Sequence, residues 1–214
     1  MRVAFLGPPG AGKGTQATRL AGKHGIPHIS TGDILRTAIA RATPTGVEAK
    51  AIVDRGELVP LPIVLRLVRD RLNEPDARGG WLLDGFPRNL DQAGAFAELL
   101  RELGQSLEAV IHFQLADAEV VRRLSGRRVC KTCGDTFHLE FSPPPDPAKC
   151  PKGKCEIVQR SDDREEAILN RLRVYAEETD PLVGHYRRAG LLRTIDAALP
   201  IAEVERAIDR LFRT

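Results

Sequence analysis

A glycine-rich segment directly after the first apolar run constrains the fold of this chain most strongly. Residues 7–15 read Gly-Pro-Pro-Gly-Ala-Gly-Lys-Gly-Thr and follow the apolar run Val3–Leu6. Glycines let the backbone curl so that several N–H groups point inward, and the N-terminus of a following helix adds a positive field. Lys13 can then reach the outer phosphates of a bound nucleotide. The segment therefore predicts a strand, a phosphate-binding loop and a helix, in that order.

A second motif strengthens this interpretation, although the loop itself departs from the usual pattern. The position after the lysine is normally Ser or Thr, whereas here it is Gly14, and Thr15 follows one place later. Farther along, the apolar run Trp81–Leu83 ends in Asp84. An aspartate at the end of a buried strand lies at the carboxyl edge of a parallel sheet, where it can organise Mg²⁺ through water.

The remaining pattern alternates short apolar runs with helical periodicity. This alternation predicts an α/β fold, a doubly wound parallel five-stranded sheet flanked by helices. We expect strands at 3–6, 28–30, 81–84, 109–113 and 191–195. We expect helices at 13–24, 33–41, 46–55, 61–73, 90–103, 117–125, 163–189 and 201–212, so that the segment from 163 to 189 forms one long helix.

The segment 127–160 differs in composition from the rest of the chain. It holds all four cysteines, three consecutive prolines and four of the seven lysines, and it contains few large apolar residues. We interpret it as a small inserted β-rich domain that needs help to fold. A structural zinc site formed by Cys130, Cys133, Cys150 and Cys155 would supply that help.

The spacing of the cysteines leaves alternatives open. Cys130 and Cys133 form a strong half-site with two residues between them, whereas four residues separate Cys150 from Cys155. His138 is a fallback ligand if Cys155 is out of reach. A redox or disulfide role and inert cysteines are the other interpretations of the cluster.

Composition excludes several classes of protein. With 42% hydrophobic residues the chain can bury its own core, so a disordered class is excluded. A net charge of +3 over 214 residues is too dilute for general coating of DNA. The first apolar run is too short for a signal peptide, and no later run reaches the length of a membrane span. We therefore expect a cytoplasmic protein.

Six motifs together resemble the adenylate kinase family. They are GPPGAGKGT at 7–15, STGD at 30–33, GELV at 56–59, LLDGFPR at 82–88, GRRVC at 126–130 and RSDDREE at 160–166. They occur in the expected order over nearly the whole chain and are similar to the long-lid form, whose lid carries zinc in some bacterial members. The resemblance implies reversible transfer of the γ-phosphoryl group of ATP to AMP, giving two ADP, with Mg²⁺ bound to ATP and a monomeric enzyme.

The resemblance also implies a division of the chain into three parts. The core comprises residues 1–29, 60–125 and 164–214, the AMP-binding arm residues 30–59, and the lid residues 126–163 with the four-cysteine metal site. We expect the arm and the lid to close over the substrates and expel water that would otherwise hydrolyse ATP.

Site residues follow from the same motifs. ATP is expected to contact Gly10, Ala11, Gly12, Lys13, Gly14, Thr15, Arg123, Arg127, Thr136 and Phe137. AMP is expected to contact Thr31, Arg36, Glu57, Leu58, Val59, Gly85, Phe86, Pro87, Arg88, Gln92, Arg160 and Arg171. The catalytic cations would be Lys13, Arg88, Arg123, Arg127, Arg160 and Arg171, and Asp84 would organise Mg²⁺. Asp162 and Asp163 are expected to orient these arginines.

Two other functions are considered. One is a nucleoside monophosphate kinase that acts on UMP, CMP or GMP, although Thr31 and Gln92 favour adenine by resemblance. The other is a nucleic-acid-binding module built on the cysteine-rich segment. That segment lacks a row of aromatic side chains for base stacking, since it contains only Phe137 and Phe141.

Overall fold

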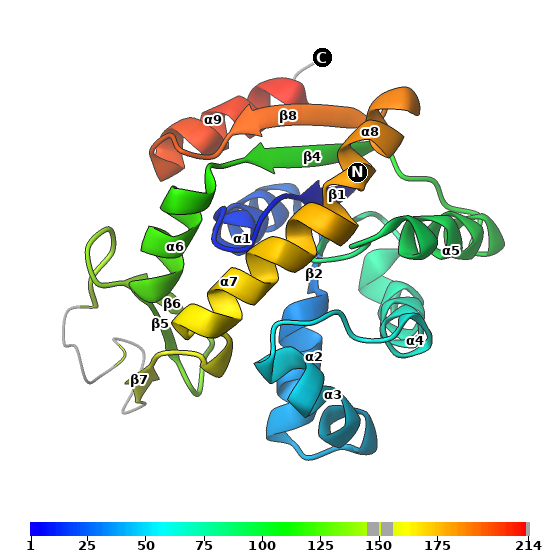
Figure 1. Ribbon diagram of the computed structural model, residues 1–214. Coiled ribbons are helices and arrows are strands. Elements are labelled where there is room, and N and C mark those ends of the chain that lie inside the picture. The colour runs from blue at the N-terminus through cyan, green and yellow to red at the C-terminus, as the bar shows by residue number, and fades with distance from the viewer. Residues whose placement is uncertain (145–149, 151–155, 213–214) are drawn as a thin grey trace.

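A parallel five-stranded sheet forms the centre of the protein (Figure 1). The structure is a computed structural model that describes residues 1–144, 150 and 156–212. The strand order is β2-β3-β1-β4-β8, and every neighbouring pair is parallel. The predicted fold class is confirmed. The strands are β1 Arg2–Leu6, β2 His28–Ser30, β3 Trp81–Asp84, β4 Ala109–Gln114 and β8 Leu192–Asp196.

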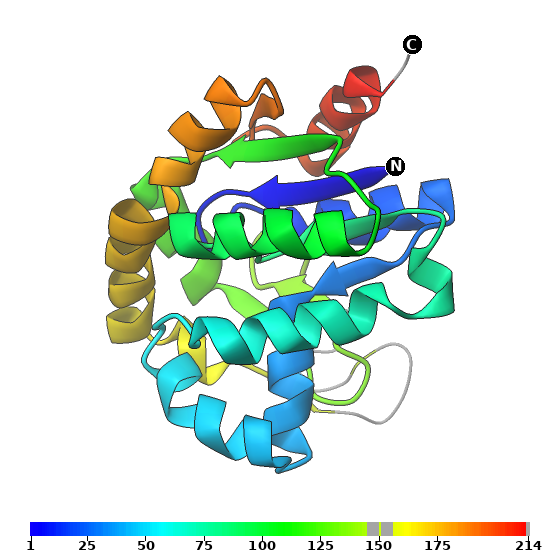
Figure 2. The ribbon, with the colours of Figure 1, turned by 90° about the vertical axis from the view of Figure 1, so that its right-hand side faces the viewer.

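Both faces of the sheet are covered, which explains why its strands are apolar runs rather than alternating ones. In β1, Ala4 and Leu6 belong to the core on one face, while Val3 and Phe5 belong to the core on the other. The first core is completed by α4, α5 and α8, and the second by α1 and α9 (Figure 2). These helices are α1 Lys13–His24, α4 Leu61–Leu72, α5 Leu90–Glu102, α8 Pro181–Arg188 and α9 Ile201–Leu211, and a 3₁₀ turn at Pro75–Ala77 precedes β3.

Two helices project from the sheet in the segment predicted to be the arm (Figure 2). They are α2 Thr31–Ala40 and α3 Pro44–Asp54. Each begins at a hydroxyl cap, because the Oγ of Ser30 accepts from the Asp33 N–H at 3.2 Å and the Oγ1 of Thr43 accepts from the Gly46 N–H at 3.1 Å. A Cβ at Gly46 would lie 2.1 Å from the Ala38 carbonyl oxygen, so the two helices cross where only glycine fits.

The segment predicted to be the lid contains a small antiparallel sheet with the order β6-β5-β7. Its strands are β5 Arg127–Cys130, β6 Thr136–His138 and β7 Ile157–Val158, and they follow α6 Asp117–Ser125. The joint between α6 and β5 is Gly126, where a Cβ would lie 2.4 Å from His138 Nε2. The predicted β-rich character of this segment is confirmed.

The prediction of one continuous helix at 163–189 is wrong, because the structure divides this segment into several elements. The structure has a 3₁₀ turn Ser161–Asp163, helix α7 Glu165–Val174, a π-helical turn Tyr175–Thr179, and then α8. Pro181 supplies the physical reason, since proline has no amide hydrogen to donate and its ring disfavours a regular preceding turn. Among the described residues, no helix combines the length and apolarity needed to cross a bilayer.

Candidate active site

The glycine-rich loop lies between the carboxyl end of β1 and the start of α1 at Lys13. Gly7, Gly10 and Gly12 have φ angles of +149°, +77° and +83°, which side chains other than glycine rarely adopt. A Cβ at Gly7 would also lie 2.7 Å from the carbonyl oxygen of Phe113 on β4. The loop therefore needs glycine at these positions, and its contact with phosphate stays a prediction.

Lys13 is held inside this loop. Its Nζ donates to the carbonyl oxygens of Gly7 and Pro8, each at 2.8 Å. Desolvation lowers the Lys13 pKa to about 8; the Asp84 carboxylate opposes this shift, and nearby arginines add to it. The charged ammonium is thus less stable here than it is in water. A bound phosphate would stabilise it, as expected of a residue that binds phosphate.

Asp84 ends β3 beside the loop, with its side chain only 12% exposed. Its Oδ2 lies 3.6 Å from His28 Nε2. A Cβ at Gly14 would lie 3.6 Å from the same Oδ2, so the residue that replaces the usual Ser or Thr leaves room next to this carboxylate. Carboxylate oxygens are ligands that Mg²⁺ prefers, and the position of Asp84 therefore fits a Mg²⁺ that carries nucleotide phosphates.

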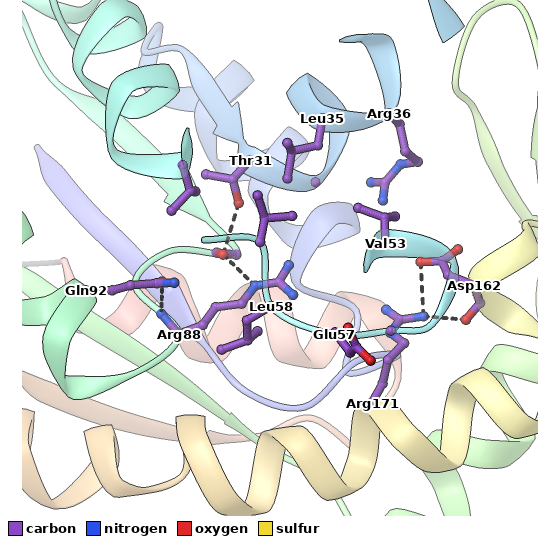
Figure 3. A pocket seen from close by; sticks show the side chains of 15 residues that line it. Thr31, Leu35, Arg36, Val53, Glu57, Leu58, Arg88, Gln92, Asp162 and Arg171 are labelled. Carbon is purple, nitrogen blue, oxygen red and sulfur yellow. Dashed lines mark hydrogen bonds and ion pairs between the residues drawn. The ribbon is translucent and has the colours of Figure 1, made fainter. Parts of the chain in front are cut away.

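A pocket of about 600 Å³, open to solvent, lies between the arm and the sheet (Figure 3). Among the residues predicted to contact AMP, those that line it are Thr31, Arg36, Glu57, Leu58, Val59, Gly85, Arg88, Gln92 and Arg171. Sequence reasoning missed five other lining residues, which are Gly32, Leu35, Val53, Gly56 and Val64. The remaining lining residue, Asp162, is one of the two aspartates expected to orient the arginines. Most of the missed residues are small or apolar, and the helical periodicity of the arm was the available signal for them.

Hydrogen bonds hold the polar wall of this pocket in place. The Thr31 hydroxyl donates to the Gly85 carbonyl oxygen at 3.0 Å, and Arg88 Nε donates to the same oxygen at 2.7 Å (Figure 3). The Arg88 backbone N–H donates to Gln92 Oε1 at 2.8 Å. Desolvation lowers the pKa of Arg88. The guanidinium is therefore positioned by the backbone, and an anion bound beside it would stabilise its charged form.

Two aspartates position arginines that come from different elements. Arg127 on β5 makes a bidentate ion pair with Asp163, with Nε 2.7 Å from Oδ2 and Nη2 2.5 Å from Oδ1. Arg171 on α7 places its Nη1 3.2 Å from Asp163 Oδ1 and 3.3 Å from Asp162 Oδ2. The Asp163 side chain has no exposed surface. One buried carboxylate thus joins the predicted lid to the core helix.

Arg160 and Arg36 face the same carboxylate of the arm. The Asp33 Oδ1 atom lies 2.5 Å from Arg36 Nη2 and 4.0 Å from Arg160 Nη2. Desolvation lowers the pKa of Arg160 and of Arg171 to about 10, and repulsion from neighbouring arginines adds to both shifts. A cluster of cations that repel one another in a desolvated site is suited to a polyanion, such as the phosphates of two nucleotides.

Some predicted residues lie elsewhere. The Phe86 side chain is buried in the core, with its ring 5.4 Å from that of Phe96, so it does not face the pocket. Arg123 on α6 donates from Nη1 to the Ala197 carbonyl oxygen at 2.9 Å. Thr136 and Phe137 lie on β6, with Thr136 exposed, and their predicted contact with ATP stays a prediction.

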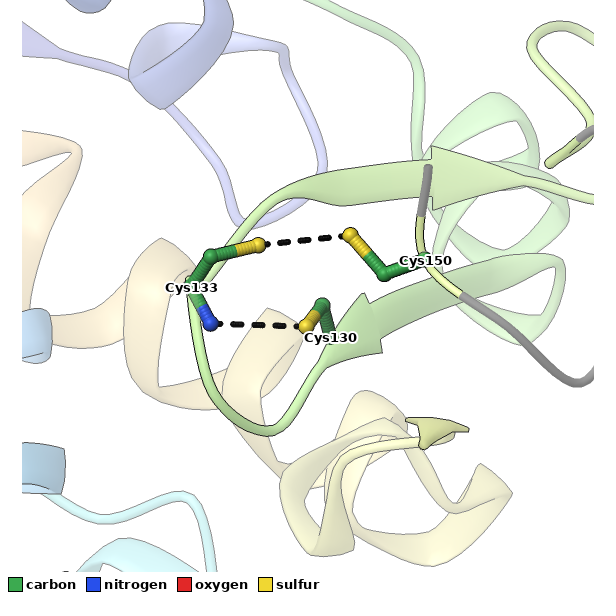
Figure 4. A group of neighbouring side chains, drawn as sticks. All are labelled: Cys130, Cys133 and Cys150. Atoms are coloured by element: carbon green, nitrogen blue, oxygen red, sulfur yellow. Dashed lines mark hydrogen bonds between the residues drawn. The ribbon is translucent and has the colours of Figure 1, made fainter. Parts of the chain in front are cut away.

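Three cysteines of the predicted metal site converge (Figure 4). The sulfur atoms of Cys130, Cys133 and Cys150 all lie within 4.8 Å of one another. The backbone N–H groups of Thr132 and Cys133 donate to Cys130 Sγ, each at 3.4 Å, a bond that stabilises a thiolate. Three sulfur donors fit a soft metal such as zinc. Cys155, the predicted fourth ligand, lies outside the described residues.

His138 does not join this cluster. Its Nδ1 accepts from the backbone N–H groups of Glu140 and Phe141 at 3.0 and 3.1 Å, and its ring stacks on Phe141 with centroids 4.3 Å apart. The idea that His138 serves as a fallback ligand therefore gains no support.

Comparisons with known proteins agree with this geometry. Residues 5–191 match the family model described as adenylate kinase. A protein named adenylate kinase from Archaeoglobus fulgidus is 47% identical, with 99% of this chain and 97% of the relative covered. Adenylate kinase from Salinispora tropica is 50% identical, with 99% and 98% covered, and adenylate kinase from Methanothrix thermoacetophila is 48% identical, with 95% and 94% covered.

Proposed function

The chain belongs to the adenylate kinase family, whose members are phosphotransferases, and on that premise we propose that its desolvated cation cluster transfers a phosphoryl group from ATP to AMP. The observation that carries the proposal is the convergence of Lys13, Arg88 and Arg171. Each of these cations is desolvated, and Arg88 and Arg171 both lower the pKa of Lys13. Bound phosphates would therefore stabilise the charged forms of these cations, which the empty site disfavours.

The chemistry assigned to these residues is alignment and charge neutralisation. The attacking group is a phosphate oxygen of AMP that is already anionic, so the reaction needs no general base. We assign the ATP phosphates to the glycine-rich loop and Lys13, and the AMP phosphate to Arg36 and Arg88. Arg127, Arg160 and Arg171 surround the group in transfer and neutralise the charge that it carries. Arg123 and the pair Thr136–Phe137 contact ATP in this proposal.

Asp84 is assigned to the metal that accompanies ATP. A bound Mg²⁺ would supply positive charge that neutralises part of the phosphate charge. Asp84 would hold this ion through water, as a carboxylate at the carboxyl edge of the sheet can. The nearby ammonium of Lys13 is kept charged in part by the same carboxylate.

AMP is the preferred acceptor in this proposal. Thr31 and Gln92 supply polar atoms next to the apolar wall formed by Leu58 and Val59, an arrangement that suits a flat purine with polar edges. The arm (residues 30–59) and the lid (residues 126–163) move as units against the core and exclude water when both substrates are bound.

The cysteine cluster is assigned a structural role. We propose that Cys130, Cys133, Cys150 and Cys155 would hold zinc in a closed structural site. The lid sheet has only short strands, and its described residues expose Leu139 and Phe141 at 53% and 47%. A metal would therefore supply folding energy that apolar burial does not supply.

Substitution of Arg88 tests the proposed function. We expect the wild-type protein to convert ATP and AMP into ADP, and Arg88→Ala to lower kcat/KM for AMP by about 100-fold or more, as the loss of a charged phosphate ligand does. Arg19, which forms an exposed ion pair with Glu205, offers a matched control, and Arg19→Ala should leave kcat/KM unchanged.

The measurement is a coupled assay of ADP formation, with circular dichroism to show that each variant is folded. A change within about threefold for Arg88→Ala, equivalent to about 0.7 kcal/mol, would contradict the assignment. Assays with UMP, CMP and GMP separate the alternative kinases, since a higher kcat/KM for UMP than for AMP would show that the assignment of adenine is wrong.

A further inference from the structure

We infer that Ser161 and Asn170 are positioning residues that hold the arm in place over bound AMP by binding its last turn, residues 54–56. The inference rests on the proposed function, because it names side chains that support the AMP site without touching substrate. Neither residue lines the AMP pocket, and neither is among the residues that the motifs predict to contact AMP.

Two hydrogen bonds reach the 54–56 turn from the segment that contains α7. The Ser161 hydroxyl donates to Asp54 Oδ1 at 2.7 Å, and Asn170 Nδ2 donates to the Arg55 carbonyl oxygen at 2.5 Å. The orientation of the Asn170 amide is determined by its other end, where Oδ1 accepts from Arg173 Nη2 at 2.9 Å. The amide therefore has one acceptor contact within α7 and one donor contact to the arm.

Close packing supports the same contact. Gly56 has φ of +74°, and a Cβ there would lie 2.6 Å from Arg171 Cγ and 3.0 Å from the Ala167 carbonyl oxygen. The turn thus lies directly against α7 and against the aliphatic stem of Arg171. Three consecutive residues of the arm touch the α7 segment, so this contact is a docking surface within the molecule.

The 54–56 turn leads directly into the pocket wall. Glu57, Leu58 and Val59 follow it and line the AMP pocket, and Arg171 lines the pocket from the α7 side (Figure 3). Glu57 and Arg171 are both labelled among the side chains that line the pocket in this view. The separation between the turn and α7 therefore determines how far the pocket opens on this side.

The expected effect of losing either contact falls on AMP. If the docked arm is the state that binds AMP, weakening the contact lowers the population of that state and raises KM for AMP by the same factor. One hydrogen bond between partly exposed groups corresponds to about a threefold to tenfold change. KM for ATP should stay within about twofold, because the ATP loop is not in contact with this turn, and kcat should not fall.

Asn170→Asp isolates the contact with the arm. Aspartate keeps an acceptor for Arg173 but replaces the donor that faces the Arg55 carbonyl oxygen by a second acceptor. Ser161→Ala removes the other contact by deleting one oxygen atom. We expect each variant to raise KM for AMP about threefold to tenfold, measured in the coupled assay and by calorimetric titration with AMP.

Matched controls are available elsewhere in the chain. Asn73 Nδ2 donates to the Arg69 carbonyl oxygen at the end of its own helix, and Ser125 Oγ donates to the Val121 carbonyl oxygen within α6. Asn73→Asp and Ser125→Ala therefore remove the same chemical groups without affecting the arm. Both should leave KM for AMP unchanged.

The results separate the possible failures. If the wild-type protein makes no ADP from ATP and AMP, the proposed function is overturned. If the wild-type protein is active and neither variant changes KM for AMP by more than about twofold, only the positioning role is overturned. A parallel rise in KM for both substrates would also overturn it, since that indicates a general structural effect. If Asn170→Asp fails to fold, Ser161→Ala decides alone.

Discussion

Lys13 shows how a single residue combines structure and chemistry. Its pKa lies at about 8 instead of 10.5, because the site desolvates the ammonium. A lowered pKa in a cation means that the free enzyme loses this charge as the pH rises through about 8, whereas bound phosphates favour the charged form. We therefore expect KM for ATP to rise above about pH 8, while kcat at saturating ATP changes little.

Initial rates measured between about pH 6.5 and 9.5 test this expectation. Lys13→Arg is the matched variant, because a guanidinium stays charged throughout that range. In that variant the rise in KM above pH 8 should disappear, whatever the absolute rate. A KM for ATP that is flat with pH in the wild-type protein would contradict the assignment of Lys13.

At the scale of elements, we expect the folding of the lid to depend on its cysteines. Its strands are two to four residues long, and Cys130 and Cys150 are nearly fully buried at 2% and 4% exposure. We expect about one zinc ion per chain, and we expect chelation to lower the melting temperature by about 4–12 °C, equivalent to about 2–3 kcal/mol. Differential scanning calorimetry with metal analysis of the same sample measures both quantities.

The core provides the control for chelation. Trp81, the single tryptophan, has no exposed surface, and its Nε1 donates to Gln105 Oε1 at 2.7 Å, far from the cysteines along the chain. Its fluorescence at room temperature should therefore not change when the metal is removed. Purified protein that contains almost no zinc would argue against a structural metal, and a shift in Trp81 emission would show that the metal supports more than the lid.

At the scale of the whole molecule, stability comes from the two cores on either side of the sheet. Phe96 on α5 is 1% exposed and contacts the rings of Trp81 and Phe86 at 5.8 and 5.4 Å. We expect Phe96→Ala to lower the free energy of unfolding by about 3–5 kcal/mol, because it leaves a cavity among rings that cannot collapse. Urea denaturation followed by circular dichroism measures the change.

Leu90 on the same helix provides the comparison, since its side chain is 49% exposed. Leu90→Ala should change the free energy of unfolding by less than about 0.5 kcal/mol. Equal effects of the two substitutions would mean that the core on this face of the sheet is not where the stability lies.

Much of the fold and of the site could be predicted because the relevant signals are local. Glycines at positive φ shape the phosphate loop within a few residues, and short apolar runs between helical patterns indicate a parallel sheet. The motif around Gly85 and Arg88 likewise identifies the pocket wall before any tertiary contact is known. The long helix was predicted wrongly at Pro181, where the missing amide hydrogen outweighed the apolar periodicity.

Other features follow only from the tertiary structure, because they join residues with no fixed relation along the chain. Ser161 and Asp54 are 107 positions apart, and the sharing of Asp163 by Arg127 and Arg171 depends on where β5 and α7 lie in the folded chain. The sequence by itself determined the glycine-rich loop, the sheet, the set of cations and the two aspartates beside them. The tertiary structure decided which arginine each aspartate contacts and where the arm rests, since desolvation and charge repulsion arise only when the chain has folded.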